Sequence, residues 1–191
     1  MANSKLIDFY GDETRWFLGE VVDVENDPKQ LGRVKVKIFG VYDNIETDDL
    51  PWAQIVVPIT QGVHEGKGQY LGILKGTQVF GMFLDGKDSQ LPMVIGTVPK
   101  KGDENSKAST TENMYPKNKV YETETGHFKE YDDSADGRIR EQHRSGTYYE
   151  MDKDGNMTIY AKGDVTVTAV GNVNVNGTRV VVNGEIVRIN S

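Results

Sequence analysis

The sequence predicts an all-β protein, with a small N-terminal barrel, a polar linker and a repetitive C-terminal β structure. Three observations lead to this prediction. Short apolar runs between residues 15 and 98 alternate with polar residues and are broken by turn residues. No stretch of ten or more residues keeps a helical period without an interrupting Gly or Pro. Residues 147–191 repeat with a period of eight.

The first region contains several short predicted strands. The run RWFLGEVVDV comes first, and Asp27 and Pro28 then predict a turn. In RVKVKIFG the apolar residues alternate with basic ones, as in a half-buried strand. The runs WAQIVVPIT, GTQVFGMFLDG and LPMVIGTV follow. About five strands with glycines at the bends indicate a closed barrel of the OB type over residues 1–98, or a comparable meander.

Residues 99–120, PKKGDENSKASTTENMYPKNKV, contain few apolar side chains. Such a segment cannot bury enough surface to offset its ordering entropy, so we expect an extended or mobile linker.

Composition narrows the function classes. The chain has 191 residues, a net charge of −7 and 37% hydrophobic residues, so a nucleic acid would be repelled unless basic residues gathered on one face. The absence of cysteine excludes disulfides, thiolate metal sites and a thiol nucleophile. The sequence shows neither a signal peptide nor a transmembrane segment, which predicts folding in the cytosol.

The predicted third region, residues 121–191, contains the repeat. Its blocks are TYYEMDKD, GNMTIYAK, GDVTVTAV, GNVNVNGT, RVVVNGEI and VRINS. Gly155, Gly163 and Gly171 open three successive blocks as predicted corners, whereas Arg179 and Val187 stand where a Gly is expected. The apolar third and fifth positions, which share one face of a short strand, are Tyr149, Met151, Met157, Ile159, Val165, Val167, Val173, Val175, Val181 and Ile189.

One chain folded in this way would expose a thin apolar face that needs cover. A run of Val and Thr at period two could be an ordinary edge or sandwich strand. A single-chain solenoid has coils of about 20 residues or more, so the repeat would supply only about two coils. An intertwined trimeric β-helix, a prism of three chains with the apolar pairs facing a common axis, closes every lateral edge and fits best.

Two stretches resemble a known family. The segment DPKQLGRVKVKIFG, with LPWAQIVVPIT, GTQVFGMFLDG and PMVIGT, resembles the OB domain of the central spike of contractile phage tail baseplates. The stretch YPKNKVYETETGHFKEYDDSADGRIREQHRSGTYYEMDKDGNMTIYAKGD resembles the junction into the β-helical needle of these spikes and of VgrG-like type VI secretion spikes. The resemblance implies a homotrimer in the virion tail baseplate that attaches to the tail hub through its OB domain and pierces the host outer membrane.

The resemblance also implies differences. The best-known spike of this type carries a lysozyme domain between barrel and needle, for which the short linker here leaves no room, so that activity is not transferred. Some short spikes end in a His-x-His pair that binds iron, but the last histidine here is His143. We therefore expect no metal or other cofactor and a separate PAAR-like tip protein.

Other candidate residues have structural interpretations. Asp132 and Asp133 could be paired carboxylates, but their surroundings predict a turn. His127 and His143 could be metal ligands or a catalytic base, although hydrogen bonding between chains at the junction is preferred. The glycine-rich loop 62–72, which includes His64, lacks the ending of a P-loop. The candidates for a base-stacking platform are Trp16, Trp52, Phe80 and Phe83, for which core packing and hub contacts are favoured.

Two function classes follow. The first is a non-enzymatic structural spike, because no nucleophile, base and orienting group can be assembled from the sequence. The alternative is an OB binding module for an oligonucleotide or glycan, with a trimerising tail.

Overall fold

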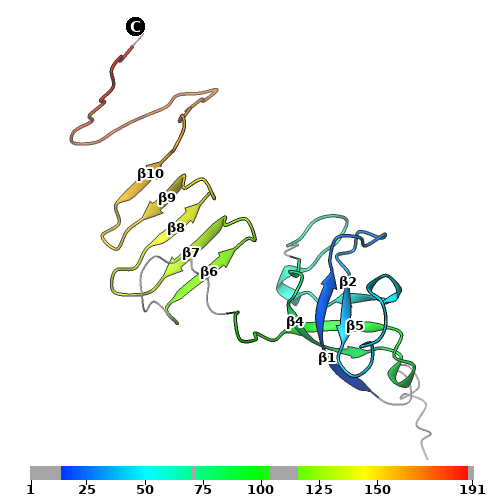
Figure 1. Cartoon of the computed structure of the whole chain (residues 1–191). Helices are drawn as coiled ribbons and strands as arrows, with labels where there is room; N and C mark the ends of the chain where they lie inside the picture. Colours follow the sequence, from blue (N-terminus) through cyan, green and yellow to red (C-terminus); the bar gives the residue numbers. More distant parts are fainter. Residues whose placement is uncertain (1–13, 70–71, 104–115, 189–191) are drawn as a thin grey trace, which may run out of the picture. The chain divides into compact units, whose positions relative to one another are not determined.

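The computed structural model of the chain describes residues 14–69, 72–103 and 116–188. The chain divides into two compact units, Met1–Glu104 and Asn105–Ser191. Strands dominate both units (Figure 1), which confirms the predicted all-β class.

Unit 1 is a closed barrel with the strand order β1-β2-β3-β5-β4. β1 pairs with both β2 and β4, and the parallel pairing of β3 with β5 completes the closure. A barrel in the first region is therefore confirmed. The strands are β1 (Arg15–Asp23), β2 (Val34–Ile38), β3 (Trp52–Ile55), β4 (Gln78–Phe83) and β5 (Pro92–Thr97), and the short 3₁₀ helices are η2 (Thr47–Asp49), η3 (Ile59–Gln61) and η4 (Gly86–Asp88).

The barrel core follows the alternation seen in the sequence. In β2, Val34, Val36 and Ile38 are buried on the inner face of the barrel. Phe83 lies in the same core, 5.1 Å from the ring centroid of Phe17. The remaining buried apolar residues of this cluster are Val21, Tyr42, Leu50, Ala53, Val79 and Val94.

Lys35 departs from the simple alternation. The pattern places it on the solvent side of β2, yet it is buried. Its ammonium group donates hydrogen bonds to the carbonyl oxygens of Thr47, at 3.0 Å, and Asp48, at 2.8 Å. It also lies 5.2 Å from the ring centroid of Trp52. The η2 turn therefore covers this position, which local periodicity could not predict.

Gly81 lies where β1, β4 and β5 approach closely. A Cβ atom there would lie 2.3 Å from the carbonyl oxygen of Met93 and 2.5 Å from the ring of Phe17. We expect Gly81→Ala to lower the free energy of unfolding of the barrel by about 3 kcal/mol, because backbone and a core ring must both move. The matched control is Gly96→Ala on β5, where a Cβ atom meets nothing within 4 Å. Urea unfolding should separate the two variants, and equal stabilities would contradict the packing described.

Unit 2 is an antiparallel meander with the order β10-β9-β8-β7-β6 (Figure 1). Three of its turns contain a glycine with positive φ, a conformation that residues with a Cβ atom rarely adopt: Gly126 at 84°, Gly146 at 91° and Gly155 at 80°. The strands are β6 (Asn118–Glu122), β7 (Phe128–Asp132), β8 (Ile139–Gln142), β9 (Tyr148–Met151) and β10 (Met157–Tyr160).

The structure also bears on the ends of unit 2. β6 begins at Asn118, so the last residues of the predicted linker 99–120 belong to the sheet, while residues 104–115 lie outside the described part. From 161 to 188 the chain contains neither a helix nor a strand (Figure 1). Among the described residues, no helix is long and apolar enough to cross a membrane.

Candidate functional site: an open sheet face and an unpaired segment

The meander of unit 2 has two faces of different character. Pairing between neighbouring strands fixes which side chains share a face. We call one the charged face; its central row is Val120, Glu130, Arg140, Glu150 and Thr158. We call the other the open face; it consists of Lys119, Tyr121, Lys129, Tyr131, Ile139, Glu141, Tyr149, Met151, Met157 and Ile159.

The charged face holds an ion-pair network within the chain. Arg138 Nε donates to Glu130 Oε2 at 3.0 Å, and Glu130 is fully buried. Glu150 Oε2 accepts from Arg140 Nη1 at 3.0 Å and lies 3.5 Å from Arg138 Nη1. The Arg140 guanidinium lies 3.9 Å from the ring centroid of Tyr148. These groups therefore find partners inside one chain.

Sequence reasoning missed this network. The signal was the order of opposite charges along the sequence, Glu130 before Arg140 and Arg140 before Glu150. Opposite charges on facing cross-strand positions stabilise a sheet. Without the strand register, however, the residues that face one another could not be identified.

The open face carries charged residues at Lys119, Lys129 and Glu141, but over β9 and β10 it is apolar and the described part of the chain does not cover it. Tyr149 lies opposite Ile159, and Met151 lies opposite Met157. All four are exposed, from 37% for Met151 to 68% for Ile159. The structure therefore brings together four of the predicted core residues on one face. It adds three exposed residues that the octad did not include, Tyr121, Tyr131 and Ile139.

The first two octads are arranged differently from the expected prism. They form the antiparallel hairpin of β9 and β10, with Gly155 in the turn at a φ of 80°. The turn is closed locally, because Asp152 Oδ1 accepts N–H bonds from Asp154 and Asn156, each at 2.9 Å. An Asp at the start and a Gly near the end of this turn therefore favour a hairpin within one chain.

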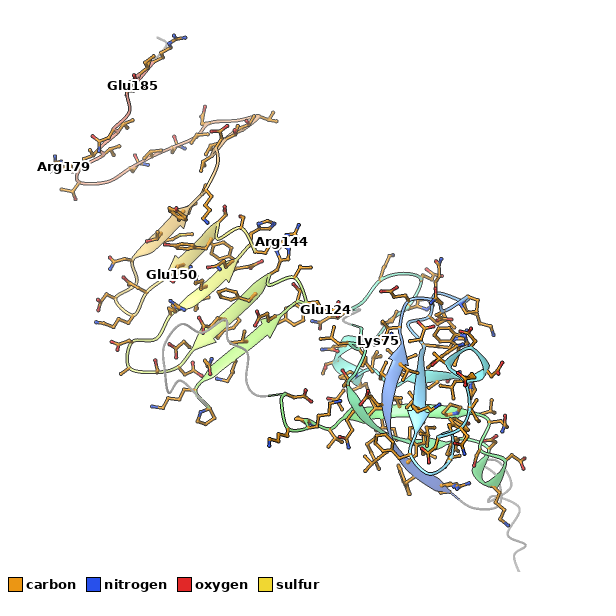
Figure 2. All side chains as sticks on the ribbon, in the orientation of Figure 1. Lys75, Glu124, Arg144, Glu150, Arg179 and Glu185 are labelled. Carbon is orange, nitrogen blue, oxygen red and sulfur yellow. The ribbon has the colours of Figure 1, made fainter. Side chains whose placement is uncertain are left out.

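The later octads lie in the extended segment 161–188. Within this fully described segment, no backbone–backbone hydrogen bond to another described residue is formed. Gly163 and Gly171 have open space around them, and Arg179 and Glu185 lie far along the segment (Figure 2). The predicted inward residue Ile189 lies outside the described residues. The remaining predicted inward residues, all exposed, are Val165, Val167, Val173, Val175 and Val181.

The other candidate residues occupy separate places. Asp132 is buried and accepts from the Ser134 hydroxyl at 2.9 Å, whereas Asp133 pairs with Lys119. The Asp132 carboxylate therefore serves the turn that follows β7, as the sequence indicated, whereas Asp133 forms an ion pair with β6. His64 lies 3.7 Å from Glu65 in its exposed loop.

The two junction histidines, in contrast, lie together. The rings of His127 and His143 have centroids 4.4 Å apart.

The four aromatic candidates do not form one platform. Trp16 and Phe80 stack on the outside of the barrel with centroids 5.2 Å apart, while Phe83 is in the core. Trp52 lies beside Lys35.

Comparison with known proteins adds a family to this geometry. The family model described as the Gp5 N-terminal OB domain matches residues 33–164, more than half of the chain. The chain belongs to the Gp5 N-terminal OB domain family. The matched region covers strands β2 to β5 of the barrel and the whole meander, whereas β1 lies before it.

Two related phage proteins are both named Gp5. The pre-baseplate central spike protein Gp5 of Enterobacteria phage T4 is 35% identical over 101 residues, which cover 48% of this chain and 17% of the T4 protein. Protein Gp5 of Vibrio phage KVP40 is 23% identical over an alignment of 271 positions. This alignment covers 84% of this chain and 64% of the relative. The chain therefore spans less than two thirds of the length of these curated relatives.

Proposed function

We propose that the chain is a structural component of a phage tail baseplate and acts as a homotrimeric central spike. The observation that carries the proposal is the combination of an uncovered apolar sheet face with an unpaired, Val-rich segment directly after it. Membership of the Gp5 family and the name of the T4 relative support the baseplate role.

The open face supports association with copies of the same chain. Large contiguous apolar patches are rare on monomeric proteins and mark interaction sites. Tyr131, Ile139, Met151 and Met157 form one row across the strands of this patch. Burial of such a row between three copies would contribute about 25 cal/mol for each Å² removed from water.

The extended segment supports the same conclusion from its backbone. Peptide groups need hydrogen-bond partners when they are buried, and β-branched residues favour strands. The octads place two apolar side chains on one face every eight residues. Two other copies supply both the missing backbone partners and the cover for these side chains, which gives the intertwined prism predicted from the sequence.

The wider assembly belongs to the same proposal. The barrel attaches the spike to the tail hub, a PAAR-like tip protein covers the C-terminal end, and the shaft pierces the outer membrane when the tail contracts. Polar residues at the outward octad positions, such as Thr166, Asn172 and Asn174, keep the shaft in solution. Antibodies against the barrel should label the baseplate end of the particles, and label elsewhere would contradict the assignment.

The proposed role is mechanical rather than enzymatic. Among the described residues, His143 Nδ1 lies 2.8 Å from the Ser145 hydroxyl, but no carboxylate orients either histidine ring, and Asp132 and Asp133 are engaged with Ser134 and Lys119. The KVP40 alignment counts 271 positions, whereas 84% of this chain is about 160 residues, so about 110 positions of that relative have no counterpart here. Release of fragments from labelled peptidoglycan by the purified chain would contradict the structural role.

A further inference from the structure

His127 and His143 are brought together by the hairpin of β7 and β8. The last residue pair of these two strands is Phe128 with Gln142, so the two histidines occupy the next facing positions. Both side chains lie on the side of Lys129 and Glu141, because residues two apart share a face. Figure 2 shows the adjacent turn residues Glu124 and Arg144 at the same edge of the sheet.

Each of the two imidazole rings has a nitrogen atom without a hydrogen-bond partner among the described residues. The Ser145 hydroxyl lies 2.8 Å from His143 Nδ1. When Nδ1 carries the ring proton it donates to this hydroxyl, and Nε2 then keeps a lone pair and has no hydrogen bond to a described residue. Neither ring nitrogen of His127 makes a hydrogen bond to the described part of the chain. The rings border an open hollow of about 410 Å³.

The ring separation matches two neighbouring ligands of one metal ion. A metal–imidazole bond of about 2.0–2.1 Å places each ring centroid about 3.2 Å from the metal. Two rings at right angles around an octahedral or square-planar ion then have centroids about 4.5 Å apart. The observed separation is 4.4 Å, with an angle of 66° between the ring planes.

The surrounding groups limit the site to two protein ligands. Among the described residues, no group of three or more His, Cys, Asp and Glu side chains is placed to hold a metal. Glu141 borders the hollow, but its carboxylate accepts the Tyr149 hydroxyl at 2.5 Å. The Lys129 ammonium lies 5.6 Å from the ring centroid of Tyr131. Water must therefore complete the coordination sphere.

We propose that His127 and His143 together bind one divalent transition-metal ion of the Ni²⁺ or Cu²⁺ type. Imidazole suits these ions, and both tolerate the right-angle arrangement with water in the other positions. The bound ion links the start of β7 to the end of β8. It stabilises the folded meander because it binds the folded state in preference to the unfolded state. The site lies at the turn end of one hairpin, on the same side of the sheet as the open face, and both of its ligands come from a single copy of the chain.

The chain offers a matched control for this proposal, because His64 is its only other histidine and lies in the barrel unit. Ni²⁺ should be titrated calorimetrically into the untagged full-length chain and into His127→Asn, His143→Asn and His64→Asn. We expect one site per chain and at least a tenfold loss of affinity in the first two variants, since the second ligand acts at a high effective concentration. The His64→Asn variant should bind as the unmodified chain does.

Thermal unfolding provides a second measurement, which does not depend on the heat of binding. Saturating Ni²⁺ should raise the unfolding temperature of the meander in the unmodified chain and in His64→Asn. It should leave His127→Asn and His143→Asn unchanged, with circular dichroism confirming that both fold. No binding at millimolar Ni²⁺, or equal affinities in all three variants, would overturn the site.

Discussion

Val175→Asp should abolish the trimer of the full-length chain. In the proposed prism this substitution places three carboxylates around one axis, in an apolar environment where each uncompensated charge costs several kcal/mol. Within a single chain Val175 is 70% exposed, so the same substitution would change little. Gel electrophoresis in SDS without heating should show a trimer band for the unmodified chain and none for Val175→Asp.

The neighbouring residue supplies the control. Asn174 is also exposed in the single chain but occupies an outward octad position. Asn174→Asp introduces the same side chain one residue away, and the trimer band should persist. Equal behaviour of the two variants would mean that the octads do not define an inner face.

Asp27→Asn should lower the free energy of unfolding of the barrel by about 3 kcal/mol at neutral pH, since it breaks a buried ion pair. The Asp27 carboxylate accepts from Arg33 Nε at 3.0 Å and Nη2 at 2.6 Å. It also accepts backbone N–H bonds from Lys29, Leu31 and Arg33. Urea unfolding measures the difference, with Asp49→Asn, an exposed aspartate of the same unit, as the control.

The effect of Asp27 should depend on pH in a defined direction. The hydrogen bonds from Arg33 hold the pKa of Asp27 well below its usual range, although burial opposes this. A folded-state pKa below the unfolded value gives stability that is complete at neutral pH and is lost on acidification. The difference between the parent chain and Asp27→Asn should therefore shrink as the pH falls below about 4, the ordinary pKa of aspartate. A difference that grows in acid would contradict this assignment.

The barrel was predictable because its signals are local. Alternation in β2 gave the buried face, and Asp27 with Pro28 gave the turn before it. The role of the Asp27 carboxylate was not predictable, because its contacts depend on the three-dimensional course of that turn. Lys35 shows the same limit, since only the fold brings η2 over it.

The meander was predicted less completely. The octad pattern identified the shared face of Tyr149, Met151, Met157 and Ile159, but not the hairpin that joins the two strands. A period of eight fits a four-residue strand followed by a four-residue turn. This unit can form a hairpin within one chain or one side of a prism built from three chains. Likewise, the spacing of 16 residues between His127 and His143 did not predict that their rings are in contact. That contact follows from the register of β7 and β8.

The central claim is that the open face and the octads are covered by two other copies of the chain. Multi-angle light scattering of the full-length protein tests it most directly, since one chain has a mass of 21.3 kDa. The proposal predicts a single species of about 64 kDa, three times that mass. A stable species of 21.3 kDa at micromolar concentration would contradict the trimer and the spike that depends on it.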